Sequence, residues 1–163
     1  MPGHGRAKLD THHHLPTLTA TDAELEIDLG PFRTLNQAPM GMTSHIVFDA
    51  WDADRPATLS PTVIEQNIRQ RIGFDGLLMT DDIDMKALSG TAGDKAAGAI
   101  AAGCDLALDC WARMEEMAEI AGRLGEISDA SRARLDRAMA SVGPAAGDFA
   151  DLIAKRDDLL ARA

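Results

Sequence analysis

Three aspartates stand close together just after an apolar segment of the chain. The run from Gly73 to Thr80 is mostly apolar, and Asp81, Asp82 and Asp84 follow it. Carboxylates this close raise one another's proton affinity, and a carboxylate at a strand end can act as nucleophile, general base or metal ligand. The alternative is a solvated turn or a helix N-cap, where aspartate is favoured.

Asp10 and His12 form a second candidate pair, because residues i and i+2 of an extended segment point to the same side. A carboxylate bound to one ring nitrogen fixes the tautomer and leaves the other nitrogen to give or take a proton near neutral pH. Two alternatives remain. The segment can be a flexible polar loop, or it can be a metal site made by histidines, namely His4, His12, His13 and His14.

Other polar residues have weaker signals. The sequence Pro2-Gly-His4-Gly5 indicates a tight turn whose glycines allow close approach of the backbone to a ligand. His45 can line the same site or be a hydrogen-bonded histidine at a strand end. Arg55 can hold a carboxylate or a sugar hydroxyl, and a surface ion pair is the alternative.

The apolar periodicity predicts alternating strands and helices that carry these residues. The expected elements of the first half are a loop over 1–18, a helix that starts at the Thr21/Glu24 capping box and bends at Pro31, a strand over 40–48, a loop over 49–60, and a helix over 61–71 that buries Val63, Ile64 and Ile68. Those of the second half are a strand over 73–80, a helix over 95–102, a strand over 104–109, a helix over 113–124, and a helical tail from Ser131 that Gly143-Pro144 interrupts.

Alternating strands and helices, with nearly continuous apolar strands, are typical of parallel βαβ units and give the class α/β. Polar residues end each predicted strand, His45 first, then Asp81 and Asp82, then Asp109. In a (β/α)8 barrel that edge holds the chemistry, and a doubly wound sheet has the same property. A complete barrel takes about 250 residues, so this chain has room for about three units.

Composition restricts the partners. The net charge of −10 makes a nucleic acid or an anionic membrane an improbable ligand, since such binding depends on clustered Lys and Arg. No apolar run approaches the ~20 residues of a membrane-spanning helix. Cys104 and Cys110 are expected to be buried, reduced thiols, which together with the lack of a signal-peptide pattern predicts a cytoplasmic setting.

Four motifs in this order resemble the bacterial β-N-acetylglucosaminidases of glycoside hydrolase family 3. They are Pro2-Gly-His-Gly5, Asp10-Thr-His12, Arg55-Pro-Ala-Thr-Leu-Ser60 and Gly73-Phe-Asp-Gly-Leu-Leu-Met-Thr-Asp-Asp82, and Pro31-Phe-Arg33 and Ala102-Gly-Cys-Asp105 also fit. The likeness extends from residue 2 to about residue 110.

The resemblance implies the carboxyl-terminal part of a (β/α)8 barrel that removes terminal N-acetylglucosamine from cell-wall fragments with retention of configuration. It implies that Asp81 is the nucleophile, that His12 is the acid/base, and that Asp10 orients His12. His4, His45 and Arg55 are expected to bind the substrate, without metal or cofactor. The predicted division is a catalytic loop (1–18), βα units (19–125) and a helical tail (126–163) within one partial domain.

One departure from the family pattern matters. The family has a strand ending Lys-His-Phe before the Pro-Gly-His-Gly turn, and here only Met1 stands there. Two alternatives to a working hexosaminidase therefore stay open: an inactive remnant that binds sugar or a partner subunit, and a histidine-rich metal-binding module. Exposed edges of a partial barrel also favour self-association.

Overall fold

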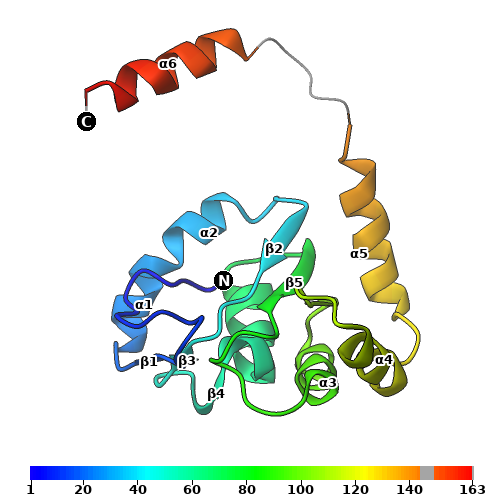
Figure 1. Cartoon of the computed structure of the whole chain (residues 1–163). Helices are drawn as coiled ribbons and strands as arrows, with labels where there is room; N and C mark the ends of the chain where they lie inside the picture. The colour runs from blue at the N-terminus through cyan, green and yellow to red at the C-terminus, as the bar shows by residue number, and fades with distance from the viewer. Residues whose placement is uncertain (144–148, 163) are drawn as a thin grey trace.

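The chain is described by a computed structural model over residues 1–143 and 149–162 (Figure 1). Its centre is a parallel sheet in the order β2-β5-β6, made of Met40–Met42, Leu77–Asp82 and Leu106–Leu108. Met40 pairs with Leu77, and Met79 pairs with Leu106. Each strand is followed along the chain by a helix that leads to the next one, so the predicted α/β class and its three βα units are confirmed.

The three helices are η2 (Val63–Arg71), α3 (Ala92–Ala102) and α4 (Met114–Arg123). Helix α3 begins where Thr91 accepts a hydrogen bond from the backbone N–H of Asp94, and it ends at Gly103. Gly103 has φ +113°, and a Cβ at this position would lie 3.0 Å from Ile64 Cγ2. Glycine therefore allows both the left-handed end of α3 and its close approach to η2.

Helix η2 has the wider hydrogen-bonding pattern of a π-helix, in which Ile72 N–H donates to the Asn67 carbonyl. Its start agrees with the sequence prediction, because Ser60 Oγ accepts a hydrogen bond from Val63 N–H. Val63, Ile64 and Ile68 are buried as predicted. The helix predicted over 61–71 is confirmed, and its π-type hydrogen bonding over Val63–Arg71 is a feature that the sequence did not predict.

A second, smaller sheet has the order β1-β3-β4 and consists of Thr17–Leu18, Val47–Phe48 and Asp52–Pro56. Strand β3 is parallel to β1 and antiparallel to β4. Two predictions were wrong here. The expected strand over 40–48 is split between the two sheets, and the expected loop over 49–60 contains β4 and the short 3-10 helix η1 (Ala57–Leu59).

The capping box predicted at Thr21 and Glu24 is confirmed: Glu24 N–H donates to Thr21 Oγ1, and Glu24 Oε2 accepts from Thr21 N–H. It opens α1 (Asp22–Asp28). The chain then makes a separate helix α2 (Gly30–Thr34), with Pro31 in its first turn. The single bent helix predicted from the sequence is therefore two helices that meet at Leu29.

The core lies between the parallel sheet and its helices. One cluster of buried side chains joins η2, β5 and α3, and it contains Leu29, Ile64, Ile68, Ile72, Phe74, Leu78, Ala99, Ala102 and Cys104. A second cluster under the smaller sheet contains Leu18, Leu25, Ile46, Phe48, Ala57 and Val63. Cys104 is buried, whereas Cys110 is exposed, which corrects the prediction that both thiols are buried.

The tail forms α5 (Asp129–Ala140) and α6 (Ala150–Leu160). Ser128 caps α5 by accepting a hydrogen bond from Ser131 N–H. The predicted interruption at Gly143-Pro144 falls partly outside the described residues, because Pro144 is not among them. Of the helices in the described ranges, none combines the length and the apolar character that crossing a membrane would need.

Candidate active site

The carboxyl ends of the three parallel strands meet at one edge, and the polar residues predicted there follow them. His45 comes shortly after β2, Asp81 and Asp82 end β5, and Asp109 follows β6. Because neighbouring parallel strands end on the same side of a sheet, these residues lie at one mouth, as the sequence analysis expected.

The three clustered aspartates differ in what they bind. Asp81 Oδ1 accepts a hydrogen bond from Asp82 N–H at 2.9 Å, and within the described ranges no ion pair joins its half-buried carboxylate. Asp82 Oδ1 instead accepts from the N–H groups of Asp84 and Cys110. Asp84 Oδ1 accepts from the guanidinium of Arg113 at 2.7 Å. Asp82 and Asp84 therefore hold the loop after β6, whereas Asp81 binds no group of that loop within the described ranges.

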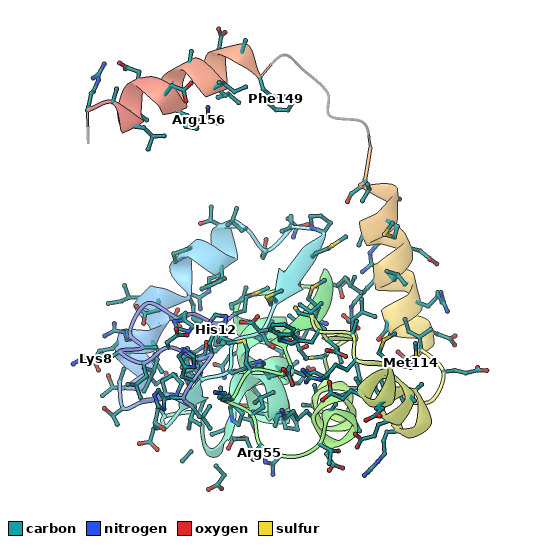
Figure 2. The ribbon with its side chains drawn as sticks, viewed as in Figure 1. Lys8, His12, Arg55, Met114, Phe149 and Arg156 are labelled. Carbon is teal, nitrogen blue, oxygen red and sulfur yellow. The ribbon has the colours of Figure 1, made fainter. Side chains whose placement is uncertain are left out.

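Asp10 and His12 form the predicted pair. His12 Nδ1 lies 2.7 Å from Asp10 Oδ1, and the same oxygen accepts from His12 N–H at 2.9 Å. Hydrogen bonds from the backbone N–H and the ring of His12 lower the pKa of Asp10, so Asp10 is a carboxylate that accepts a hydrogen bond from Nδ1–H. The side chain of His12, labelled in Figure 2, is 71% exposed, and within the described ranges no hydrogen bond engages Nε2.

The loop that carries His12 contacts the turn that follows Asp81. The backbone carbonyl of His12 accepts a hydrogen bond from Lys86 N–H at 3.4 Å. The tight turn predicted around His4 joins the same loop, because His4 Nε2 lies 3.4 Å from Thr11 Oγ1. The Asp10–His12 pair and Asp81 are thus carried by two segments that are hydrogen-bonded to each other.

His45 is fully buried, and both of its ring nitrogens are bonded. Nε2 lies 3.0 Å from the backbone carbonyl of Asp82, and Nδ1 lies 2.7 Å from Thr58 Oγ1. A carbonyl only accepts, so Nε2 carries a hydrogen. Burial lowers the pKa of His45 although the Asp82 carbonyl opposes this, and a neutral ring then accepts at Nδ1 from the Thr58 hydroxyl. This geometry matches the strand-end alternative and ties His45 to the backbone beside Asp81.

Arg55 lies elsewhere. It belongs to β4, its side chain is exposed, and Figure 2 places it at the lower edge of the fold, away from His12. His13 and His14 are also exposed, with ring centroids 6.4 Å apart. Over residues 1–143 and 149–162, no group of three or more His, Cys, Asp or Glu side chains is placed to hold a metal ion, so the histidine-rich metal site is not formed by these residues.

Two contributors to the site escaped the sequence analysis. Thr58 binds His45, and Arg113 binds Asp84. Thr58 belongs to the motif Arg55-Pro-Ala-Thr-Leu-Ser60, but the sequence pattern does not show that its hydroxyl is buried against a histidine. Arg113 stands just before α4, and nothing in the sequence around it shows that it pairs with Asp84, 29 residues earlier.

A reactive carboxylate and a histidine held by a second carboxylate are the groups needed for covalent transfer with acid/base assistance. The carboxylate attacks an electrophilic carbon, and the imidazole protonates the leaving group and later deprotonates water. Nothing in this chemistry calls for a metal or an organic cofactor.

Residues 1–143 match the family described as "Glycosyl hydrolase family 3 N terminal domain". Among curated proteins, the chain is 42% identical over 114 residues to a beta-hexosaminidase of Chromobacterium violaceum, covering 67% of this chain and 32% of that protein. It is 33% identical over 156 residues to a beta-hexosaminidase of Thioalkalivibrio sulfidiphilus, covering 93% of this chain and 44% of that protein.

Solved structures agree. A glycoside hydrolase family 3 beta-N-acetylglucosaminidase from Paenibacillus sp. matches 90% of this chain and 32% of its own, with 30% identity and a TM-score of 0.71. NagZ from Neisseria gonorrhoeae in complex with N-trifluoroacetyl-D-glucosamine matches 87% of this chain and 41% of its own, with 31% identity and a TM-score of 0.70. The chain spans 32% to 44% of the lengths of these four relatives. The predicted partial-barrel fold is confirmed.

Proposed function

The chain belongs to glycosyl hydrolase family 3, and from this premise we propose that it acts as part of a retaining β-N-acetylhexosaminidase. The observation that carries the proposal is the Asp10–His12 pair, 2.7 Å between Oδ1 and Nδ1, on a loop bonded to the turn after Asp81. The named activity of the relatives supports the substrate class, a β-linked N-acetylamino sugar.

In the first step, the Asp81 carboxylate attacks the anomeric carbon and forms a covalent glycosyl ester. His12, protonated on both nitrogens, gives its Nε2 proton to the glycosidic oxygen as that bond breaks. Asp10 keeps its hydrogen bond to Nδ1 and so holds the ring in place. The usual arrangement uses a carboxylic acid for this proton, and here a histidine replaces it.

In the second step, His12 Nε2 takes a proton from water, and the water oxygen attacks the anomeric carbon of the ester. The sugar leaves with its original configuration, and the Asp81 carboxylate is restored. Two inversions at one carbon give overall retention. His45 has no ring nitrogen free for a sugar, so its part in the proposal is to hold the backbone beside Asp81 and not to bind substrate. His4 stays a proposed substrate contact, and the exposed position of Arg55 on β4 gives no support to its predicted substrate contact.

The natural substrate that we propose is a cell-wall fragment with a terminal N-acetylglucosamine, acted on in the cytoplasm. The net charge of −10 supports a partner other than nucleic acid. The unpaired thiols of Cys104 and Cys110 fit a reducing compartment. The division into catalytic loop, βα units and helical tail remains a prediction.

The direct experiment measures release of 4-nitrophenol from 4-nitrophenyl β-N-acetylglucosaminide by the purified chain. Asp81→Asn should abolish release, and Asp54→Asn, a matched change on the surface of β4, should keep the rate. The first product seen by proton NMR should be the β-anomer. A folded sample without hydrolysis would instead favour the sugar-binding remnant, and an α-anomer would exclude the covalent step.

A further inference from the structure

The loop after β6, residues 109–113, is here called the rim loop. It begins directly beside the end of β5, because Asp82 pairs with Leu108 in the parallel sheet. Ile83 N–H donates to the Leu108 carbonyl at 2.9 Å and extends this contact past the strand ends. The rim loop therefore borders the mouth where Asp81 lies.

Two further bonds fix the rim loop to the acidic turn. Cys110 N–H donates to Asp82 Oδ1 at 3.2 Å, and the Arg113 guanidinium donates to Asp84 Oδ1 at 2.7 Å. Arg113 also donates to Glu116, which anchors the same guanidinium to the first turn of α4. A loop held at both ends by the turn that follows the nucleophile keeps a constant position relative to Asp81.

The rim loop presents Trp111, whose side chain is exposed to 68%. The other tryptophan of the chain, Trp51, stacks on Phe48 at 5.0 Å and donates its indole N–H to Asp22. In the described part of the chain, Trp111 has neither a ring partner nor an indole hydrogen bond. Tryptophan offers a large rigid face for stacking, and leaving that face in water is costly unless something binds it.

The backbone holds Trp111 in this outward position. Asp109 Oδ1 accepts from Trp111 N–H at 3.2 Å and from Ala112 N–H at 3.4 Å. Ala112 has φ 49°, in the left-handed region that alanine seldom adopts. The loop is thus a fixed turn, and the exposure of Trp111 belongs to its folded geometry.

We propose that Trp111 is the platform on which the ring of the leaving group stacks, so that it determines specificity beyond the N-acetylamino sugar. This rests on the proposed function. The acids around the rim loop, namely Asp82, Asp84, Asp109 and Glu116, disfavour an anionic group, and the one guanidinium in the loop, that of Arg113, is bonded to Asp84 and Glu116. The ligand is therefore a neutral flat ring, a pyranose or an aryl group.

The test compares three substrates that share N-acetylglucosamine and differ in the leaving group: methyl, 4-nitrophenyl and a second N-acetylglucosamine. Trp111→Ala should raise KM about 2- to 10-fold for the two ring-bearing substrates, the range that aromatic stacking contributes. KM for the methyl glycoside should not change. Trp111→Phe should recover most of the loss, and Met114→Ala, an exposed apolar neighbour on α4, should behave as the wild type.

A second arm tests the bond between Arg113 and Asp84 that fixes the rim loop. Asp84→Asn removes the ion pair that joins Arg113 to the turn after β5 and leaves Arg113 bonded to Glu116 alone. The variant should therefore reproduce the leaving-group dependence of Trp111→Ala, and the double variant should lose no more than either single one. Additive losses, or equal losses for all three substrates, would overturn the proposal.

A binding arm separates this proposal from the proposed function. In Asp81→Asn/Trp51→Phe protein, Trp111 is the single tryptophan, and its fluorescence should change on titration with N,N′-diacetylchitobiose. That result supports the platform even if the chain hydrolyses nothing. Unchanged fluorescence overturns the platform while activity in the wild type still stands. A change of sedimentation coefficient in Trp111→Ala, with KM unaltered, would mean that Trp111 contacts a second copy instead.

Discussion

The carboxylates at the end of β5 have different roles because their hydrogen-bond partners differ. The sequence predicted that Asp81, Asp82 and Asp84 would cluster, since their spacing after an apolar strand requires it. It did not predict that Asp82 and Asp84 would bind Cys110 N–H and Arg113, because those partners lie 28 and 29 residues away. The assignment of Asp81 as nucleophile rests on the resemblance and stays a prediction, which Asp81→Asn tests.

In the proposed mechanism Asp10 orients the His12 ring through the contact between Oδ1 and Nδ1, so loss of the Asp10 charge should affect the rate more than substrate binding. We expect Asp10→Asn to lower kcat for the aryl glycoside by about 10- to 100-fold, part of the 10² to 10⁴ that general acid/base catalysis contributes. KM should change little. His13→Ala, which alters the neighbouring exposed histidine, is the control. Equal rates for wild type and Asp10→Asn would remove Asp10 from the mechanism.

His45 should make stability depend on pH. Its pKa is lowered by burial in the folded state, so the unfolded chain binds the proton first as the pH falls below about 6.5. Stability is therefore full above that pH and decreases as the pH falls toward the folded pKa. His45→Gln keeps a donor toward Asp82 without the titration, and its urea midpoint should vary less between pH 7 and pH 5 than that of the wild type.

The same variant distinguishes support of Asp81 from general stability. His45→Gln should retain measurable kcat, whereas His45→Ala, which leaves the Asp82 carbonyl and Thr58 without this partner, should lose kcat at pH 7 under conditions where circular dichroism shows it folded. If both variants keep wild-type kcat, the contact to Asp82 has no part in positioning Asp81.

At the scale of elements, the sequence predicted the helices around the parallel sheet well and the small sheet poorly. Thr21 and Ser60 are local signals, and each marks a helix start as expected. Helix α3 ends at Ala102 as predicted, and Gly103, which was not singled out from the sequence, forms its cap. Strand β4 reads Asp-Ala-Asp-Arg-Pro, which contains residues that seldom favour strands. It forms because β3 supplies an antiparallel partner, and such pairing cannot be predicted from the few consecutive residues of the strand itself.

The buried residues of η2 form one row along the helix. Ile64, Ile68 and Ile72 recur every four positions and lie in one cluster with Phe74 and Leu78. Residues four apart share a face of a helix, so this row is what the sequence predicts. The π-type hydrogen bonds, such as that from Ile72 N–H to the Asn67 carbonyl, have no signal in that spacing.

Ile68 lies at the centre of that row and is fully buried. We expect Ile68→Ala to lower the free energy of unfolding by about 2–5 kcal/mol, the cost of lost burial plus a cavity. Urea unfolding followed by circular dichroism measures this. Gln66→Ala, on the exposed side of η2, should change it by less than about 0.5 kcal/mol. Similar values for the two variants would contradict the packing that we describe.

At the scale of the whole molecule, Asp105 joins the tail to the sheet. Its carboxylate binds Arg69 at 2.9 Å, Leu78 N–H at 2.8 Å, and from α5 it binds Ser131 at 2.7 Å and Arg134 at 3.1 Å. The side chain of Asp105 is almost completely buried, and that of Arg69 nearly so. Helix α5 is thereby attached to the end of the sheet opposite the site.

Burial raises the pKa of Asp105, but the Leu78 N–H, the Ser131 hydroxyl and the two guanidinium groups outweigh it, and the net pKa is lowered. The stabilisation is therefore complete above the unfolded pKa of about 3.9 and is lost as the pH falls through the folded value. Asp105→Asn should cost about 3 kcal/mol at pH 7, since it leaves buried Arg69 without its charge partner.

The difference in unfolding free energy between wild type and Asp105→Asn should shrink below about pH 4, which urea titrations at pH 7, 5 and 3.5 will show. Asp158→Asn, which removes an exposed pair with Arg162 on α6, should cost less than about 1 kcal/mol at every pH. A constant difference across the three pH values would mean that Asp105 does not titrate as we describe.

The left-handed backbone of Ala112 affects the step at which the rim loop loses its conformational entropy. Alanine is strained in this conformation, and the hydrogen bonds of Asp109 to Trp111 N–H and Ala112 N–H hold it there. The freedom of the rim loop is therefore given up when the chain folds and not when a ligand arrives. A ring that settles on Trp111 then meets a surface already fixed in shape. Most of the free energy of stacking therefore contributes to affinity, because little is needed to order the loop.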